Sequence, residues 1–310
     1  MSILITGGDG LVGQALRSVV ADTKGLGNVT FATRQDADLT QVDQTADLFE
    51  RVRPTHVIHG AAIVGGIGGN IMHSGEFFTQ NIAINTNVLE QARVHGIERL
   101  TSFMSTCVFP DTAIYPLTVD QLHQGAPHPS NFAYAYAKRM LDVQSRAYRA
   151  QWDCDFVTLI PTNIYGPHDN WSLSEGHVIP SLIHKVYLAK AKKDPLVVWG
   201  SGKPLREFVF SEDIARLALW ALDNYRSDQP LILSSGIETT IADAVATVCE
   251  AMGFEGQVVF DSEKPDGQFR KPSDTGPLRA ELPAFEFTDF AQGIRTSVNW
   301  FFNNYPHVRM

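Results

Sequence analysis

The chain has 310 residues, 44% of them hydrophobic and 19% charged, with a formal net charge of -9 at pH 7. This composition predicts a globular protein with a full core, and the acidic balance argues against a nucleic-acid partner, which needs a basic face. No apolar run approaches the roughly 20 residues of a bilayer span and the amino terminus lacks a signal peptide, so we expect no membrane partner and a cytoplasmic location.

Cysteine usage is consistent with a reducing compartment. Cys107, Cys154 and Cys249 lie far apart, and none belongs to a CxxC pair. That spacing fits neither a disulfide framework nor a zinc site. We therefore expect free thiols and no bound metal.

The first half of the chain alternates between short apolar runs and amphipathic stretches. The runs at 3–6, 29–33, 56–59, 100–105 and 156–160 read as strands, and the stretches at 13–21, 44–52 and 81–95 read as helices. That alternation predicts an α/β fold with a doubly wound, Rossmann-type parallel sheet covered on both faces.

The alternation of strands and helices becomes less regular after Pro167, although helices are still expected at 178–191, 211–225, 241–252 and 290–303. We predict a dinucleotide-binding domain over residues 1–166. Residues 167–310 should form mainly a smaller mixed α/β domain that binds substrate, with some segments returning to the first domain.

A glycine-rich turn joins the first strand to the first helix. Gly7, Gly10 and Gly13 follow strand 3–6 directly, and the helix is expected to begin at Leu11 or Val12. Glycines without a Cβ permit a tight turn and a close approach by a pyrophosphate, which binds the free amides of the helix start. A loop that binds nothing is the alternative, and the strand–turn–helix context disfavours it.

The end of the second strand bears on the choice between NAD and NADP. The acid that would hold a ribose 2′-hydroxyl is missing there, and Arg34 follows instead, which favours the 2′-phosphate of NADP. An ordinary surface arginine is nearly as good an interpretation of Arg34. Asp9 inside the glycine turn weakens the NADP prediction, because a carboxylate repels a phosphate; Asp38 and Leu39 could border the adenine.

A tyrosine and a lysine in YAYAK stand four residues apart on a predicted helix. Tyr134 and Lys138 therefore project from one face, and a lysine cation there should lower the pKa of the tyrosine toward neutral pH. Ser105, at the end of the fourth strand, could add a second hydroxyl. Tyr136 is a rival that lies only two residues from Lys138 and points elsewhere.

The glycine turn, the serine and YxxxK occur here in the order typical of the extended short-chain dehydrogenase/reductase family, which the chain resembles. Further motifs resemble, almost end to end, the members of that family that epimerise C3 and C5 of GDP-4-keto-6-deoxy-D-mannose and then reduce C4 with NADPH. These motifs are STCVFP at 105–110, PTNIYGPHDNW at 161–171, GHVIP at 176–180, VWGSGKPLREF at 198–208 and KPDGQFRK at 264–271.

The resemblance implies a base and an acid for the two epimerisations. Cys107 would be the base and His177 the acid, while Ser105 and Tyr134 hold the ketone oxygen. If the fourth strand continues past Ser105, Cys107 faces the same side, and its thiol needs a lowered pKa. Taken alone, Cys107 would be a buried apolar filler, and His177 a helix-start or loop residue.

The resemblance also implies the residues that contact the cofactor and the GDP-sugar. The cofactor set is Gly7, Gly8, Asp9, Gly10, Leu11, Val12, Gly13, Arg34, Asp38, Leu39, Ala61, Ala62, Phe103, Met104, Lys138, Pro161, Thr162, Asn163, Ile164 and His177. The substrate set is Lys185, Trp199, Arg206, Asp266 and Lys271, in which cations suit a diphosphate and the tryptophan can pack beside it.

Two other functions compete with this hypothesis. A nucleotide-sugar 4-epimerase or 4,6-dehydratase would retain and regenerate its cofactor, and dehydratases of the family usually carry a threonine and an acidic pair where this chain has STC. A non-catalytic NADP-binding sensor would typically have lost the tyrosine or the lysine. The family also implies a homodimer built from two helices per subunit, here expected around residues 88–93 and 141–149.

Overall fold

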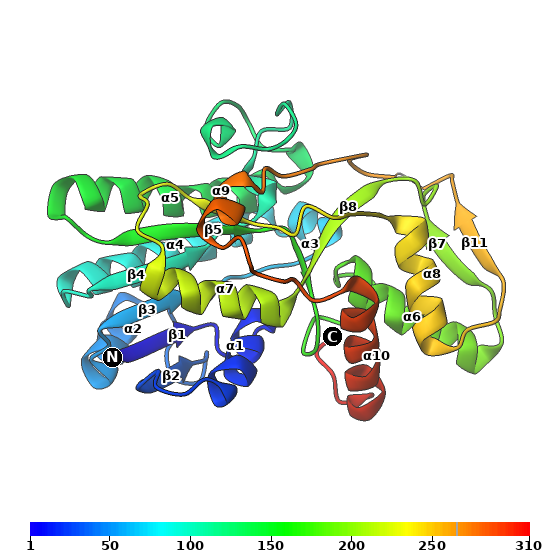
Figure 1. Cartoon of the computed structure of the whole chain (residues 1–310), viewed down its shortest axis with the longest axis horizontal. Coiled ribbons are helices and arrows are strands. Elements are labelled where there is room, and N and C mark those ends of the chain that lie inside the picture. Colours follow the sequence, from blue (N-terminus) through cyan, green and yellow to red (C-terminus); the bar gives the residue numbers. More distant parts are fainter. Residues whose placement is uncertain (265) are drawn as a thin grey trace.

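The computed structural model describes residues 1–264 and 266–310; Pro265, within the motif at 264–271, lies outside them. A six-stranded sheet forms the centre of the first lobe, and every neighbouring pair in it is parallel (Figure 1). Its order is β2-β1-β3-β4-β5-β9. The strands are β1 (Ser2–Thr6), β2 (Asn28–Ala32), β3 (His56–His59), β4 (Arg99–Phe103), β5 (Phe156–Pro161) and β9 (Leu231–Leu233).

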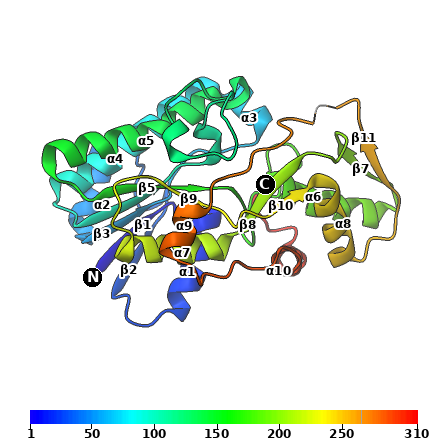
Figure 2. The same cartoon turned by 45° about the horizontal axis from the view of Figure 1, so that its top comes forward.

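Helices cover both faces of this sheet, as the expected doubly wound fold requires (Figures 1 and 2). One face packs against α1 (Leu11–Asp22), α7 (Ser211–Asn224) and α9 (Gly276–Glu281). The other packs against α2 (Val42–Val52), α4 (Ser74–Val94) and α5 (Phe132–Trp152). Alternate residues of β1 serve the two cores, since Ile3 and Ile5 point to one face and Leu4 to the other. The predicted fold class is confirmed.

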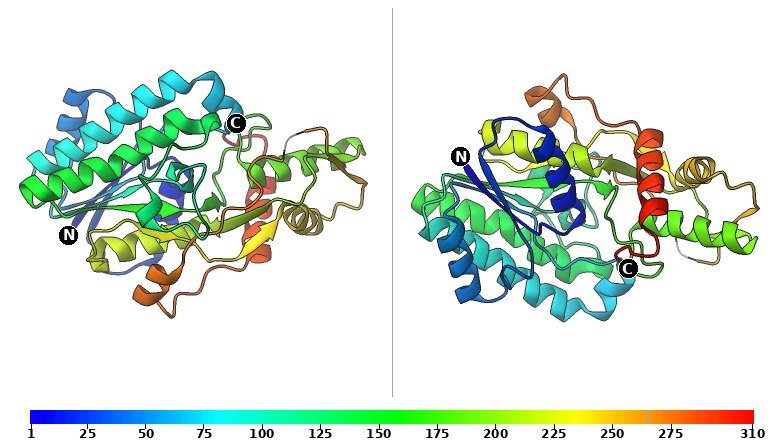
Figure 3. Two further views of the ribbon diagram at one scale, coloured as in Figure 1. Left: turned by 90° about the horizontal axis from the view of Figure 1, so that it is seen from above. Right: turned by 90° about the horizontal axis from the view of Figure 1, so that it is seen from below.

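The two longest of these helices, α4 and α5, lie side by side across one face (Figure 3). A short helix, α3 (Ile67–Met72), precedes α4. Within the described part of the chain, none of the helices combines the length and the apolar composition that a bilayer crossing requires.

A second lobe has its own core around Tyr165, Trp171 and Phe301. It contains a three-stranded sheet of β10 (Glu238–Thr240), β8 (Leu205–Phe210) and β6 (Asn163–Tyr165), and a parallel pair of β11 (Val258–Asp261) and β7 (Leu196–Trp199). The helices α6 (Val178–Lys192), α8 (Ile241–Met252) and α10 (Phe290–Asn304) pack around them. Segments from the second half of the chain, β9, α7 and α9, belong to the first lobe.

Candidate active site

The glycine turn lies at the carboxyl end of β1. Gly7 has a φ of +76°, a conformation that a glycine adopts without strain, and a Cβ on Gly13 would collide with the Gly7 carbonyl oxygen. A Cβ on Gly10, by contrast, would meet only that oxygen, at 3.3 Å. Gly10 is also the N-cap of α1 and offers no side-chain cap, so the first amides of the helix stay free for an anion.

Strand order reverses between β1 and β3, and this is where open α/β sheets bind ligands. The loop after β3 approaches the turn closely, since a Cβ on Gly7 would lie 2.8 Å from the backbone nitrogen of Ala61. Ala62 follows in the same loop. Just after β5, the buried hydroxyl of Thr162 has no hydrogen-bond partner among the described residues. The uncapped start of α1 and this hydroxyl fit a bound dinucleotide.

An arginine that sequence analysis missed lies beside the end of β2. The Arg17 guanidinium stands 4.2 Å over the Phe31 ring, and its Nε donates to the Gly8 carbonyl at 3.3 Å. Arg34 and Asp9, which bear on the choice of cofactor, are both exposed. The signal was available, because Arg17 stands four residues after Gly13 on the first helix.

The acid expected beside the adenine is already engaged by its own turn. Asp38 accepts hydrogen bonds from the backbone N–H of Thr40 at 3.0 Å and from its hydroxyl at 2.8 Å. These bonds, assisted by Arg34, lower the pKa of the Asp38 carboxyl. The carbonyl of Leu39 accepts from the Asn87 amide at 2.9 Å.

Ser105 and Cys107 lie together, but not for the reason expected. The strand β4 ends at Phe103, and Thr106–Val108 form a 3-10 turn, so the two side chains do not alternate along one strand. Instead the Ser105 hydroxyl accepts a hydrogen bond from the backbone N–H of Cys107 at 3.5 Å and caps the turn. A cap, rather than strand periodicity, brings them together.

Tyr134 and Lys138 both lie on α5. Lys138 is buried, and its Nζ donates to the Phe103 carbonyl at 3.0 Å. Burial lowers the pKa of Lys138 to about 8. The expected lowering of the tyrosine pKa is wrong: burial, reinforced by Cys107, raises the pKa of Tyr134, so its hydroxyl is neutral and can act as an acid. Tyr136 instead lies under the Arg139 guanidinium, 5.2 Å from it.

The pKa of the Cys107 thiol also departs from expectation. Burial raises it, although the Ser105 hydroxyl and the cations of Lys271 and Lys138 act in the opposite direction. The resting thiol is therefore protonated at neutral pH, and the neighbouring hydroxyl and cations are what favour the thiolate. Lys271, expected among the substrate contacts, thus lies within electrostatic reach of Cys107.

His177 is the N-cap of α6, and it is exposed. Among the residues that the structure describes, no hydrogen bond or ion pair joins it to Ser105, Cys107, Tyr134 or Lys138. Its loop packs against the loop after β3, since the Gly66 N–H donates to the Glu175 carbonyl at 3.0 Å. The structure therefore groups four of the five expected catalytic residues, and His177 lies exposed outside that group.

The expected substrate residues fall into two groups. Lys185 and Trp199 line a cavity of about 380 Å³ between α6 and β7. The Lys185 ammonium lies 5.2 Å from the Trp199 ring, and that ring is 65% exposed. Lys264, which was not expected there, lies 5.8 Å from the same ring. An exposed indole flanked by two cations suits a nucleotide.

The second group lies on β8 and on the segment that follows β11. Asp266 accepts hydrogen bonds from the backbone N–H of Ser201 at 2.6 Å and from its hydroxyl at 2.8 Å. Its carboxylate therefore fastens the segment to the end of β7. Burial lowers the pKa of Arg206, while Asp266 raises it, and Lys271 lies further along the same segment.

The nicotinamide end of the expected site is formed by residues at the ends of β4 and β5 and in β6. Phe103 offers its carbonyl to Lys138, and the backbone N–H of Met104 donates to Leu159 at 2.8 Å. Pro161 ends β5, and Asn163 and Ile164 begin β6. The Asn163 amide donates to the Glu207 carbonyl at 2.9 Å.

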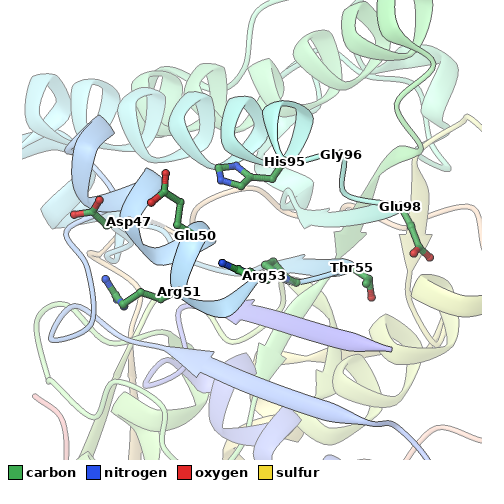
Figure 4. Close-up of a pocket in the computed structure, with 9 residues that line it drawn as sticks. Asp47, Glu50, Arg51, Arg53, Thr55, His95, Gly96 and Glu98 are labelled. Carbon is green, nitrogen blue, oxygen red and sulfur yellow. The ribbon is translucent and has the colours of Figure 1, made fainter.

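A larger cavity of about 800 Å³ lies at the other end of the central strands, where β3 and β4 begin (Figure 4). It is formed by α2, the end of α4 and the amino ends of β3 and β4, with Glu50, Arg53 and His95 among its residues. Both acidic and basic side chains line it. It is remote from the carboxyl ends of the strands, where the predicted residues gather.

Residues 3–234 match the NAD dependent epimerase/dehydratase family, and the chain belongs to that family. The GDP-L-fucose synthase of Dictyostelium discoideum is 46% identical over 99% of this chain and 97% of its own length, and the probable GDP-L-fucose synthase of Drosophila melanogaster is 42% identical over 99% of both. A GDP-L-fucose synthetase from Naegleria fowleri, solved bound to NADP, gives a TM-score of 0.95 at 41% identity, over 99% of this chain and 96% of that one. Within the family, the chain groups with the GDP-L-fucose synthases.

Proposed function

We propose that this protein converts GDP-4-keto-6-deoxy-D-mannose to GDP-L-fucose with NADPH, by epimerisation at C3 and C5 followed by reduction at C4. The observation that carries the proposal is the grouping of a serine, a cysteine, a tyrosine and a lysine beside the glycine turn. Ser105 and Cys107 share one capped turn, and Cys107 acts electrostatically on Tyr134 and Lys138. A reductase needs the tyrosine and lysine, and an epimerase needs the additional proton carrier.

Bound NADPH would supply a hydride to C4 of the sugar. The amides at the start of α1 would hold its pyrophosphate, and Arg17 and Arg34 would pair with the 2′-phosphate. Phe103, Met104 and residues 161–164 would line the nicotinamide. The buried Thr162 hydroxyl, which finds no hydrogen-bond partner in the described part of the chain, supports this assignment.

Epimerisation begins at a carbon that the C4 ketone acidifies. The Cys107 thiolate would take the proton from C3, forming an S–H bond, while the electron pair of the broken C–H bond moves to the ketone oxygen. Ser105 and Tyr134 would donate hydrogen bonds to that oxygen. The His177 imidazolium would return a proton to the opposite face of C3. Proton exchange with solvent would then restore the Cys107 thiolate and the His177 imidazolium, and the same two transfers at C5 would complete the second inversion.

Reduction uses the same oxygen. As the hydride reaches C4, Tyr134 would give its proton to the developing alkoxide, and the Lys138 ammonium would stabilise the phenolate left behind. The raised pKa of Tyr134 supports this role, because the acid has to be protonated before the step.

The diphosphate and the base would lie along the second lobe. Arg206 and Lys271 would pair with phosphate oxygens, and Lys185 with Trp199 would hold the nucleoside in the cavity beside α6. Asp266 would act indirectly, by holding its segment against Ser201.

The test is turnover of purified protein with GDP-4-keto-6-deoxy-D-mannose and NADPH, followed by NMR of the product. The expected result is stoichiometric oxidation of NADPH and formation of GDP-L-fucose. A 4-epimerase or dehydratase would retain its cofactor without net oxidation, and a sensor would bind NADPH and turn over nothing; either result contradicts the proposal.

A single substitution tests the assigned base. Cys107→Ser keeps the size of the side chain and removes the thiol, so exchange of solvent deuterium into C3 and C5 should fall by about 100-fold or more. NADPH binding should stay unchanged. Cys249→Ser, in the core of the second lobe, is the matched control. An unchanged exchange rate in Cys107→Ser would remove the base from the mechanism.

We further propose a homodimer that forms through α4 and α5, in the cytoplasm, where the three cysteines would remain thiols. Val88, Leu89 and Leu141, within the segments expected at the interface, are buried inside the chain. Exposed apolar side chains of these helices that lie in or next to the expected segments, such as Val94 and Val143, are better placed to meet a partner.

A further inference from the structure

Three buried polar side chains beneath the site take no part in the proposed chemistry. Thr6 ends β1, His59 ends β3, and Asn85 lies in the middle of α4. All three are at most 2% exposed. Polar groups at such depth are normally paired, and these pair with one another in a line that crosses from the sheet to α4.

The direction of each hydrogen bond in this line is determined. The Asn85 amide nitrogen donates to the Ala137 carbonyl at 3.1 Å, so its oxygen faces His59 Nε2, also at 3.1 Å. Nε2 must therefore carry the proton, which leaves Nδ1 to accept from the Thr6 hydroxyl at 2.8 Å. The Thr6 oxygen in turn accepts from the Ala61 N–H at 3.3 Å.

His59 stays neutral in this arrangement. Burial, together with the nearby Lys138 cation, lowers the pKa of His59 to about 3. A neutral imidazole carries one donor and one acceptor, so the uncharged ring satisfies both neighbours without reorganisation. A charged ring would have two donors and no acceptor for the Thr6 hydroxyl.

The two ends of the line belong to the two halves of the candidate site. Thr6 precedes Gly7, and Ala61 lies in the loop that closes over that glycine, where the dinucleotide would bind. At the other end, Ala137 directly precedes Lys138 on α5, one turn from Tyr134. The line thus connects the cofactor turn with the helix that carries the expected acid.

We propose that Thr6, His59 and Asn85 are positioning residues that hold the dinucleotide turn in register with Tyr134 and Lys138. The inference rests on the proposed function, because register matters only if a hydride and a proton reach one carbonyl group together. A displacement of about 1 Å between reacting groups can slow a reaction about 100-fold.

The test separates the two ends of the line by measuring different quantities. Asn85→Leu frees α5, so single-turnover hydride transfer should slow by about 10-fold to 100-fold while the Kd for NADPH, measured by fluorescence without substrate, changes less than about twofold. Thr6→Val frees the turn, so the Kd should rise up to about tenfold. Thr6→Ser keeps the hydroxyl and should restore binding.

Ser297→Ala is the matched control, because it removes a buried hydroxyl that donates to the Gly293 carbonyl at 2.8 Å on α10 in the second lobe. It should lower thermal stability and leave both the Kd and the transfer rate unchanged. The proposal is overturned if folded Asn85→Leu transfers hydride at the wild-type rate, or if the Kd and the rate change together in both line variants.

If the variants fail to fold, a measurement on the wild-type protein still tests the proposal. Nitrogen-15 NMR should show His59 as the neutral Nε2–H tautomer from about pH 5 to about pH 9. Titration of the His59 ring in that range, or the opposite tautomer, would refute the proposed hydrogen bonds among Thr6, His59 and Asn85. If wild-type protein does not turn over GDP-4-keto-6-deoxy-D-mannose, the proposed function fails, while the NADPH affinities and the NMR result still decide whether the line exists.

Discussion

Two tyrosines two residues apart on α5 have different surroundings. Tyr134 is close enough to Cys107 for the thiol to affect its pKa, whereas Tyr136 lies against Arg139. We predict that Tyr134→Phe lowers the rate of NADPH oxidation by about 100-fold to 10,000-fold, because the ketone oxygen loses its acid. Tyr136→Phe should retain the rate to within a few fold. Equal losses in steady-state assays of the two variants would contradict the assignment.

The lowered pKa of Lys138 predicts how activity depends on pH. Lys138 is charged below its pKa of about 8 and neutral above it, so the cation that stabilises the phenolate is lost as pH rises. The maximal rate of NADPH oxidation should therefore decline through about pH 8, with the circular dichroism spectrum unchanged. A rate that stays constant to about pH 10 would exclude the charged lysine from the rate-limiting step.

Arg17 provides a test of cofactor preference. Its guanidinium is held by Phe31 and Gly8 next to the end of β2. We predict that Arg17→Met raises the KM for NADPH by about 10-fold to 100-fold, the value of a lost charge-assisted hydrogen bond, and leaves the KM for NADH nearly unchanged. Arg295→Met, on the exposed side of α10, is the control. A parallel rise with both cofactors would show that Arg17 supports the fold only.

Residue types and spacing were enough to predict that Tyr134 and Lys138 lie four residues apart on one helix, α5. They were not enough to predict the pKa shifts. The directions for Tyr134 and Cys107 depend on burial by elements distant in sequence, and no local pattern reports it. The spacing of Arg17 from Gly13 places it on the first helix, but its stacking on Phe31, which lies on a different element, leaves no trace in that spacing.

At the scale of elements, the start of α1 depends on one glycine. A Cβ on Gly13 would lie 2.8 Å from the Gly8 backbone and would collide with the Gly7 carbonyl oxygen. Gly13→Ala should therefore push the turn open and weaken NADPH binding by at least about tenfold, as measured by fluorescence titration. Gly75→Ala is the control, since a Cβ there meets no atom within 4 Å. Wild-type affinity in Gly13→Ala would show that the turn tolerates the methyl group.

Most strands and helices could be placed from hydrophobic periodicity, and α8 has the expected bounds of 241–252. The error at the end of β4 has a physical cause. The predicted strand continues to residue 105, but β4 ends at Phe103. The Ser105 hydroxyl accepts a hydrogen bond from the N–H of Cys107 and caps the 3-10 helix that follows. A side-chain cap of this kind competes with strand pairing, and periodicity does not detect it.

At the scale of the whole molecule, we propose that residues 1–166 bind the dinucleotide and that residues 167–310 mainly bind the sugar nucleotide, although the two parts share a core. Much of the core on one face of the central sheet comes from α7, with Ile214, Leu217 and Leu222 fully or almost fully buried. The sequence predicted that some later segments would join the first domain, but not that α7 would be one of them. The alternation of strands and helices does not specify which later helix covers a sheet formed earlier in the chain.

A fragment of residues 1–166 lacks α7, β9 and α9, so one face of its sheet would be exposed. We predict that the fragment aggregates or shows no cooperative thermal unfolding, in contrast to the full chain. Circular dichroism melts and size-exclusion chromatography of both would check this. A monodisperse fragment with a sharp transition would show that the first lobe folds on its own.

The segment 266–274 crosses between the lobes and is fastened along its length. Asp266 binds Ser201, the Phe269 carbonyl accepts from the Leu205 N–H at 2.9 Å, and Leu117 exchanges backbone hydrogen bonds with Pro272 and Asp274 at 2.8 and 2.9 Å. A hinge that swung the lobes apart would have to break these bonds. We therefore expect the two lobes to keep nearly the same separation when a sugar nucleotide binds.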